Sequence, residues 1–533
     1  MRTMKEYPRS IITVHALRDP MVARGCIICP LLTKSCVCIR FESIRPFHKC
    51  YLFTAGSLHF HYVQICFSGE LQNMKSFKPD YNPSGNDRYA YLTQTPIPGL
   101  ISRLAVPTII SMLVTAVYNA ADTFFVGRIS TQATAAVGLS FSVMALIQAL
   151  AFACGQGSGS YLSRMLGAGD LTQARQMAST GFALSLILGI LTAFWGNLFL
   201  DPLCRAVGAT ATTMPDTRIY MRIILIGAPF MMGQFVINNQ LRYQGSAFYA
   251  MVGLMAGALL NIILDPVLIF VFDLGVAGAA IATVTGQFIS FFVLILGSLR
   301  GGNIHPSPDD VRLNFHYLKE IVNAGIPSLF RQGMAAVATL LLNTSAGIYG
   351  GDAAIAGMSI VTRVMMFQVS ALIGFGQGYQ PVASFNYGAG LKKRVREGYL
   401  FCLKYGTICL TITGILCFIF APSILRFFRN DPAVIETGSC ALRWQAAVLP
   451  LMAVIVMTNM MFQSMGLGVK ASLTSSMRNG IFFIPLILIL PRLLGLTGVE
   501  ITQPCADLLS AGFIIPMAVM ELKKLRQDEY GCE

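Results

Sequence analysis

Charged residues are scarce in this chain of 533 residues. They make up 12 % of it, whereas soluble domains carry roughly 25 %. Tryptophan occurs only twice, and hydrophobic residues reach 54 %. The few charges are gathered in short segments, and the apolar runs between them reach about 20 residues, enough to cross a ~30 Å hydrocarbon core. This composition excludes an ordinary soluble domain and predicts an integral membrane protein.

Several chemical signatures are also missing. Residues 62–304 contain no histidine, and the predicted spans hold neither a His-Glu-x-x-His nor a Gly-x-Ser-x-Gly motif, which argues against a membrane enzyme. Without a Walker sequence, ATP does not drive the protein directly. No filter-like repeat or ring of charges favours a channel. We therefore expect no catalytic residues, no enzyme activity and no cofactor.

The apolar runs predict an all-α membrane protein with twelve transmembrane helices. Glycine and proline inside the runs do not oppose this prediction, because both are commoner in membrane helices than in soluble ones. The expected spans are 101–125, 134–158, 176–199, 216–240, 248–271, 276–299, 318–346, 353–381, 398–421, 437–464, 471–490 and 498–520.

A pattern of glycine and proline residues recurs in the chain after about 220 residues. Pro107 corresponds to Pro327 and Pro229 to Pro450, and the Gly-Gln-Gly at 155–157 returns at 376–378. The Gly-Ala-Gly at 167–169 likewise returns at 388–390. Two similar six-helix halves are typical of secondary transporters, in which the halves rock about a shared site. The predicted divisions are an extension 1–73, a cytoplasmic segment 74–100, a first bundle 101–299, a linker 300–317, a second bundle 318–522 and a tail 523–533.

Basic residues predict the orientation. They are concentrated in alternate loops, as in 392–396 and 523–526, and the intervening loops hold fewer. The richer loops face the cytoplasm by the positive-inside rule, so both termini are expected inside and the two halves are parallel repeats. The net charge of +14 needs no nucleic-acid partner. The expected location is the bacterial cytoplasmic membrane, and the expected state is a monomer in the lipid bilayer.

The extension 1–73 differs from the rest of the chain. It holds six of the fourteen cysteines and four of the six histidines, but their spacing lacks a second Cys-x-x-Cys pair, which makes a zinc site a minor alternative. We interpret the extension as disordered or as spurious upstream translation, with Met74 as a plausible start. The other cysteines are scattered and indicate packing rather than disulfides.

Three acidic residues lie well inside the predicted spans. A carboxylate within the membrane is costly and therefore points to function. Asp122 and Asp265 lie at a similar depth, and Asn261 shares a helix face with Asp265 because it precedes it by one turn. Neither acid recurs in the second half. The group can hold a proton or a small cation, since two nearby carboxylates share a proton; alternatively, each acid separately pairs with a helix partner. The third acid is Asp507, and Glu500 lies at a helix mouth.

Several motifs in order resemble the multidrug and toxin extrusion (MATE) family in its bacterial branch. They are Tyr-Asn-Ala-Ala-Asp-Thr-Phe-Phe-Val-Gly at 118–127, Ala-Ala-Val-Gly at 135–138, Gly-Gln-Gly at 155–157 and Asn261-x-x-x-Asp265-Pro266. The resemblance covers about 98–520. It implies two helical bundles around a cavity, drug export against a proton or sodium gradient, and a cation site at Asp122, Asn261 and Asp265. The sequence predicts no other metal site.

Other polar residues are candidates for lining the substrate cavity. Separately, Pro107 is expected to kink its helix. The alternative for the amides is that they join helices. Arg331 and Arg363 are deep cations that could instead pair with Asp507. Arg331, Gln332 and Asn343 stand where some family members carry an acid, so a second ion site is not expected. The cavity candidates are Tyr118, Asn119, Gln156, Asn238, Gln240, Arg331, Gln332 and Asn343.

The sequence thus predicts a proton- or sodium-coupled antiporter that exports small organic compounds, mostly apolar cations. The runner-up is a flippase for lipid-linked saccharides of the same broad superfamily. A flippase would need a more basic cavity, and Arg331 with Arg363 supports that alternative.

Overall fold

The computed structural model describes residues 13–16, 37–40, 47–53, 63–67 and 85–530. The chain divides into two units, Met1–Tyr81 and Asn82–Glu533. The first contributes four antiparallel strands in the order β1 (Thr13–Ala16), β2 (Val37–Arg40), β3 (Phe47–Phe53) and β4 (Val63–Phe67). The side chains of this unit, and with them the cysteines and histidines considered for zinc, lie outside the described part.

The first half of the helical unit follows a short helix, α1 (Gly85–Gln94). The turns of the first half show why its helices begin and end where they do: the side chains of Ser130 and Asp170 cap α3 (Thr131–Ala168) and α4 (Leu171–Leu198), and Gly169 ends α3 with φ 82°. Gly390, the counterpart of Gly169, has φ 75°, so the repeated Gly-Ala-Gly marks a left-handed turn. The elements are α2 (Ile97–Val126), α3 (Thr131–Ala168), α4 (Leu171–Leu198), α5 (Leu200–Ala206), α6 (Met214–Tyr243), α7 (Ala247–Pro266), the π-helix η3 (Val267–Val271) and α8 (Gly275–Leu299).

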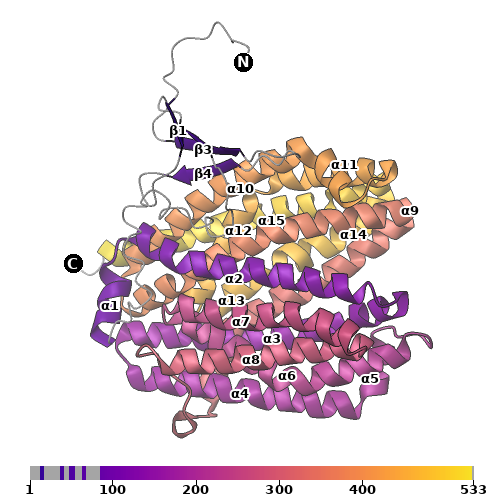
Figure 1. Cartoon of the computed structure of the whole chain (residues 1–533). Coiled ribbons are helices and arrows are strands. Elements are labelled where there is room, and N and C mark those ends of the chain that lie inside the picture. Colours follow the sequence, from indigo (N-terminus) through magenta and orange to yellow (C-terminus); the bar gives the residue numbers. More distant parts are fainter. Residues whose placement is uncertain (1–12, 17–36, 41–46, 54–62, 68–84, 531–533) are drawn as a thin grey trace, which may run out of the picture. The chain divides into compact units, whose positions relative to one another are not determined.

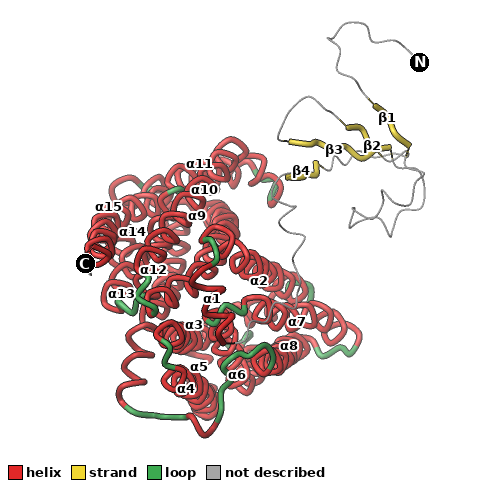
Figure 2. The backbone as a smooth tube through the Cα atoms, turned by 90° about the vertical axis from the view of Figure 1, so that its left-hand side faces the viewer, coloured by secondary structure: helices red, strands yellow, loops and turns green. Residues whose placement is uncertain are grey.

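The second half begins after a 3-10 turn, η4 (Pro308–Asp310). Its helices form a separate group beside α2–α8, as Figure 2 shows. They are α9 (Phe315–Gly388), α10 (Lys392–Phe428), α11 (Pro432–Val448), α12 (Leu451–Ser464), α13 (Gly468–Ser476), the π-helix η5 (Met477–Phe482), α14 (Phe483–Leu494) and α15 (Leu496–Tyr530).

The helical, membrane-spanning fold class is confirmed for the helical unit. Among the described residues, ten helices are long and apolar enough to span a membrane, or eleven if α11 and α12, bent by 56°, form one span. One of these, α9, changes direction at Gly351, where φ is 62°. It therefore covers two of the twelve predicted spans, 318–346 and 353–381.

Repeated glycines bring the two halves together at one end. A Cβ on Gly167 would overlap the carbonyl oxygen of Phe385, and a Cβ on Gly388 would overlap that of Arg164. In the same way Gly157 faces the backbone of Ile321. Close approach of helix backbones through small residues is typical of membrane packing. The glycines noticed as a repeat are therefore the contact surface between the halves.

Polar contacts join the halves at the same end. Ser160 Oγ donates to the carbonyl of Gln463 at 2.9 Å, and Arg164 forms an ion pair with Glu320 at 3.3 Å. Thr108 Oγ1, one residue after Pro107, donates to the carbonyl of Gly374 at 2.8 Å. These groups lie on α2, α3, α9 and α12, so the halves are in direct contact at this end, which we call the closed end.

Helix α1 fastens the closed end across both halves. Arg88 donates to the Gly301 carbonyl at 3.0 Å and to Asn303 Oδ1 at 2.9 Å, in the linker that follows the first half. The Leu92 carbonyl accepts from Asn386 Nδ2 at 3.1 Å and from Arg394 in the second half. Figure 1 shows α1 at the end where the C-terminus lies.

A chain that begins at Met74 is expected to insert into membranes and melt at the temperature of the full chain, because α1 and the repeat lie beyond it. A chain that begins at Pro96 lacks α1 and should melt several degrees lower. Thermal unfolding in detergent measures both. Unfolding of the Met74 chain, or stoichiometric zinc bound by the full chain, would show that residues 1–73 matter.

Substituting a glycine of the closed end should force the halves apart. Gly388→Ala and Gly167→Ala should each destabilise this state by about 1–3 kcal/mol, because the new methyl groups meet backbone. Gly512→Ala on α15 is the control, since a Cβ there meets nothing within 4 Å. Spin-label distances across the closed end report the opening. Unchanged distances in both test variants would contradict this view of the contact.

Candidate functional site

The predicted cation group is assembled from α2 and α7, which pack against each other. Asp265 is fully buried, and Asn261 is 2 % exposed. Asn261 Nδ2 donates to Asp265 Oδ1 and to Thr283 Oγ1, both at 3.4 Å. Asp122 interacts electrostatically with Asp265, and its Oδ1 is buried without a hydrogen-bond partner. The structure thus brings the three predicted residues into one polar group.

The two prolines of these helices differ in effect. α7 ends at Pro266 and continues directly as the π-helix η3, which agrees with the looser backbone hydrogen bonding expected beyond a proline. Pro107 lies buried inside α2, and the helix runs through it unbroken from Ile97 to Val126. Ser111 Oγ donates to the Pro107 carbonyl at 2.8 Å.

A cavity of about 230 Å³ lies beside the carboxylates. Asn261 and Thr283 belong to its wall, which connects it to the cation group. The first half supplies most of the lining, from α2, α3, α6, α7 and α8, and α9 supplies the rest. Among the predicted cavity residues, those that line it are Tyr118, Asn119, Arg331 and Gln332.

The remaining amide candidates do not line this cavity. Gln156 accepts from the Tyr243 hydroxyl at 2.7 Å, and Asn238 Nδ2 donates to the Ala250 carbonyl at 2.9 Å. Gln240 Nε2 donates to the Ala178 carbonyl at 2.9 Å. These bonds join neighbouring helices, which is the alternative considered for them. Asn343 is half-buried further along α9, outside the lining.

Asp507 has a different partner from those considered in the sequence. Arg478 Nε donates to Asp507 Oδ1 at 2.7 Å, and Gln503 donates to the same oxygen at 3.0 Å. Arg363 is exposed on α9. Pairing of Asp507 with Arg331 or Arg363 is therefore wrong: the nearer cation is on η5, in a helix segment that packs against α15.

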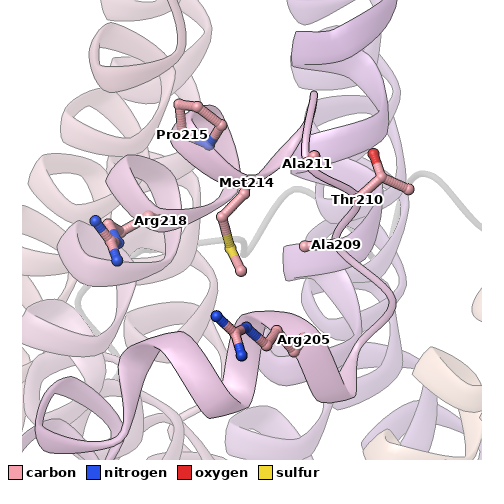
Figure 3. A pocket seen from close by; sticks show the side chains of 7 residues that line it. All are labelled: Arg205, Ala209, Thr210, Ala211, Met214, Pro215 and Arg218. Atoms are coloured by element: carbon pink, nitrogen blue, oxygen red, sulfur yellow. The ribbon is translucent and has the colours of Figure 1, made fainter.

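A second, wider cavity of about 570 Å³ opens where α5 leads into α6. Figure 3 shows Met214 between the side chains of Arg205 and Arg218. Arg218 forms an ion pair with the exposed Asp201. None of the predicted site residues lines this cavity.

Sequence reasoning missed several residues around the carboxylates. Tyr220 is buried on α6, hydrogen-bonds to Thr283 and interacts electrostatically with both Asp122 and Asp265. Gln234 and Gln287 line the cavity, each with a buried Oε1 that has no partner. No motif marks these positions. A polar residue within an apolar run was the available signal, but such residues are common in helix contacts.

Comparisons with known proteins agree on one family. A MatE family model matches residues 107–267 and 327–489. The multidrug export proteins MepA of Staphylococcus aureus (strain N315) and Staphylococcus saprophyticus are each 27 % identical to this chain; the alignments cover 83 % and 80 % of it, and 97 % and 93 % of those relatives. Among solved structures, an outward-facing MATE family multidrug resistance transporter aligns with a TM-score of 0.77 at 29 % identity, over 82 % of this chain and 98 % of that one. A MOP superfamily transporter from Pyrococcus furiosus gives 0.77 at 28 %, over the same shares.

The two classes of amide should respond differently to mutation. Gln240→Leu should lower stability by about 1 kcal/mol, because it removes bonds between helices, and should leave ligand affinity unchanged. Gln332→Leu should change the affinity of cavity ligands and leave the melting temperature near that of the wild type. Melting curves and dye binding in detergent measure the two effects. The distinction between the classes fails if Gln240→Leu weakens binding without a loss of stability.

Proposed function

Since the chain belongs to the MatE family, we propose that it is a multidrug exporter driven by antiport of protons or sodium ions. It spans the membrane many times. The coupling ion would bind at Asp122, Asn261 and Asp265, and small organic compounds, mostly apolar cations, would bind in the cavity beside them. The Staphylococcus relatives are named multidrug export proteins, which supports export as the direction of transport.

The observation that carries this proposal is the arrangement of the two carboxylates. Asp265 is wholly buried, and Asp122 has a buried oxygen with no hydrogen-bond partner. A membrane-embedded acid of this kind is costly unless a proton or cation neutralises it. Asn261, which donates to Asp265, also lines the cavity, and this supports a cation site next to it. Binding at one position can therefore alter binding at the other.

Antiport requires that the ion and the substrate disfavour each other's binding. This coupling is a reciprocal free energy between linked sites. A cation on the carboxylates removes the negative charge that would attract an organic cation to the adjacent wall. The closed end between the halves carries α1, the linker and the C-terminus, which we assign to the cytoplasm of a bacterial cell. On this assignment the structure is closed toward the cytoplasm, and the membrane would be the plasma membrane.

The flippase alternative is supported by one residue. Arg331 lines the cavity, and a cation there suits a lipid phosphate. It is the only charged side chain among the described residues of that lining, whereas a diphosphate-linked saccharide calls for several. The carboxylates beside the cavity favour the antiporter.

Asp122→Asn and Asp265→Asn are each expected to abolish ion-driven export or reduce it at least tenfold, because an amide cannot release a proton or balance a cation. Wild type and variants are compared in proteoliposomes with an imposed proton gradient, and separately with a sodium gradient. Substrate-induced flux of the active ion identifies it.

Asp201→Asn is the matched control, since this acid is in the same half but exposed at the surface. It should transport like the wild type. Equal melting temperatures establish that all variants are folded. Wild-type export by both folded test variants would remove the support for coupling at this site.

A further inference from the structure

Arg331 is a cation without a counter-charge. It is on α9 and lines the cavity. Its one described hydrogen bond is long, 3.5 Å from Nη1 to Asn459 Oδ1. A guanidinium has five N–H donors, so most of them are left for another partner. Arg242, close enough to repel it electrostatically, adds to the positive potential at this side of the cavity.

Three acids of the second half form ion pairs with cations other than Arg331. Asp507 pairs with Arg478 at 2.7 Å, Glu521 pairs with Lys470, and Glu320 pairs with Arg164 at 3.3 Å. Arg242 is itself satisfied by amide oxygens, at Gln377 and, at 2.6 Å, at Asn239. Within the described residues, Arg331 therefore has no acidic partner. An unpaired charge at membrane depth is expensive and points to a ligand.

The wall contributed by the first half has the opposite character. Gln234 and Gln287 each present a buried Oε1 without a partner, and Ser290 presents a buried Oγ. These side chains are 6 %, 8 % and 2 % exposed. Their oxygens accept hydrogen bonds, and the carboxylates of Asp122 and Asp265 are on the same half. This wall suits N–H donors of an amine or ammonium group.

We infer that the cavity takes amphipathic zwitterions, with the substrate's carboxylate on Arg331 and its amine end against the first half. This inference rests on the proposed export function and narrows its substrate class from organic cations to molecules with both charges. Arginine binds a carboxylate through two parallel hydrogen bonds, which fixes orientation as well as adding energy. Gln332, the next residue on α9, also lines the cavity beside this pole.

The test uses two dyes that differ at one group. Rhodamine 110 carries amines and a free carboxylate, and rhodamine 123 is its methyl ester. Equilibrium binding to purified full-length protein is measured by fluorescence anisotropy. Arg331→Gln should lower the affinity for rhodamine 110 by on the order of 10- to 100-fold, the effect of losing hydrogen bonds to a charged group. It should change the affinity for rhodamine 123 less than threefold. Arg331→Lys should give an intermediate loss for rhodamine 110.

Gln287→Leu is the comparison variant for the opposite wall and should weaken both dyes alike. Unchanged rhodamine 123 affinity also shows that the Arg331 variants are folded. Equal effects of Arg331→Gln on both dyes would overturn the proposal. The proposal would also be overturned if short-chain phosphatidylglycerol displaced rhodamine 110 and bound as tightly as the dye does. The ligand of Arg331 would then be a lipid phosphate. If the protein binds the dyes as expected but its proteoliposomes transport neither dye, the proposed export function fails while the binding inference stands.

Discussion

The close approach of two helix backbones at the closed end is the contact on which the rest of the structure depends. Gly167 against Phe385 and Gly388 against Arg164 allow carbonyls of one half to lie where a Cβ of the other would be. Membrane helices gain little from the hydrophobic effect, so packing of this kind and interhelical hydrogen bonds hold them together. The cavity is lined by residues further along the same helices, α2, α3 and α9.

The internal repeat explains the scaffold but not the chemistry. Both halves use glycines at equivalent positions for the contact, whereas Asp122 and Asp265 occur only in the first half and Arg331 lines the cavity from the second. Duplication preserves what packing requires of both copies. The charged groups are free to differ, and they do, so the cavity has two unlike walls.

The sequence predicts the helical membrane fold well, because hydrophobic length is a local signal. Charge in an apolar run points to Asp122 and Asp265, and their role as an ion site stays a prediction. The sequence cannot separate cavity amides from those that join helices. Gln234 and Asn238 are one turn apart on α6, yet Asn238 bonds to the Ala250 carbonyl while Gln234 lines the cavity. That difference depends on what the neighbouring helix presents at each height. The break at Gly351 within α9 falls between the predicted spans 318–346 and 353–381, whereas the partner of Asp507, Arg478, depends on the packing of η5 against α15.

The unlike walls suggest how ion and substrate exclude each other without overlapping. In the proposed scheme, loss of the cation from Asp122 and Asp265 makes the first wall more negative, while the charge of Arg331 stays the same. The amine end of a zwitterion is then bound more tightly, while the binding of its carboxylate is unchanged. Return of the cation reverses only the first effect. A ligand shifts an equilibrium only through a differential interaction with the two states, and here the first wall supplies that difference while Arg331 holds the substrate in register. Coupling and selectivity would accordingly reside in different halves of the protein.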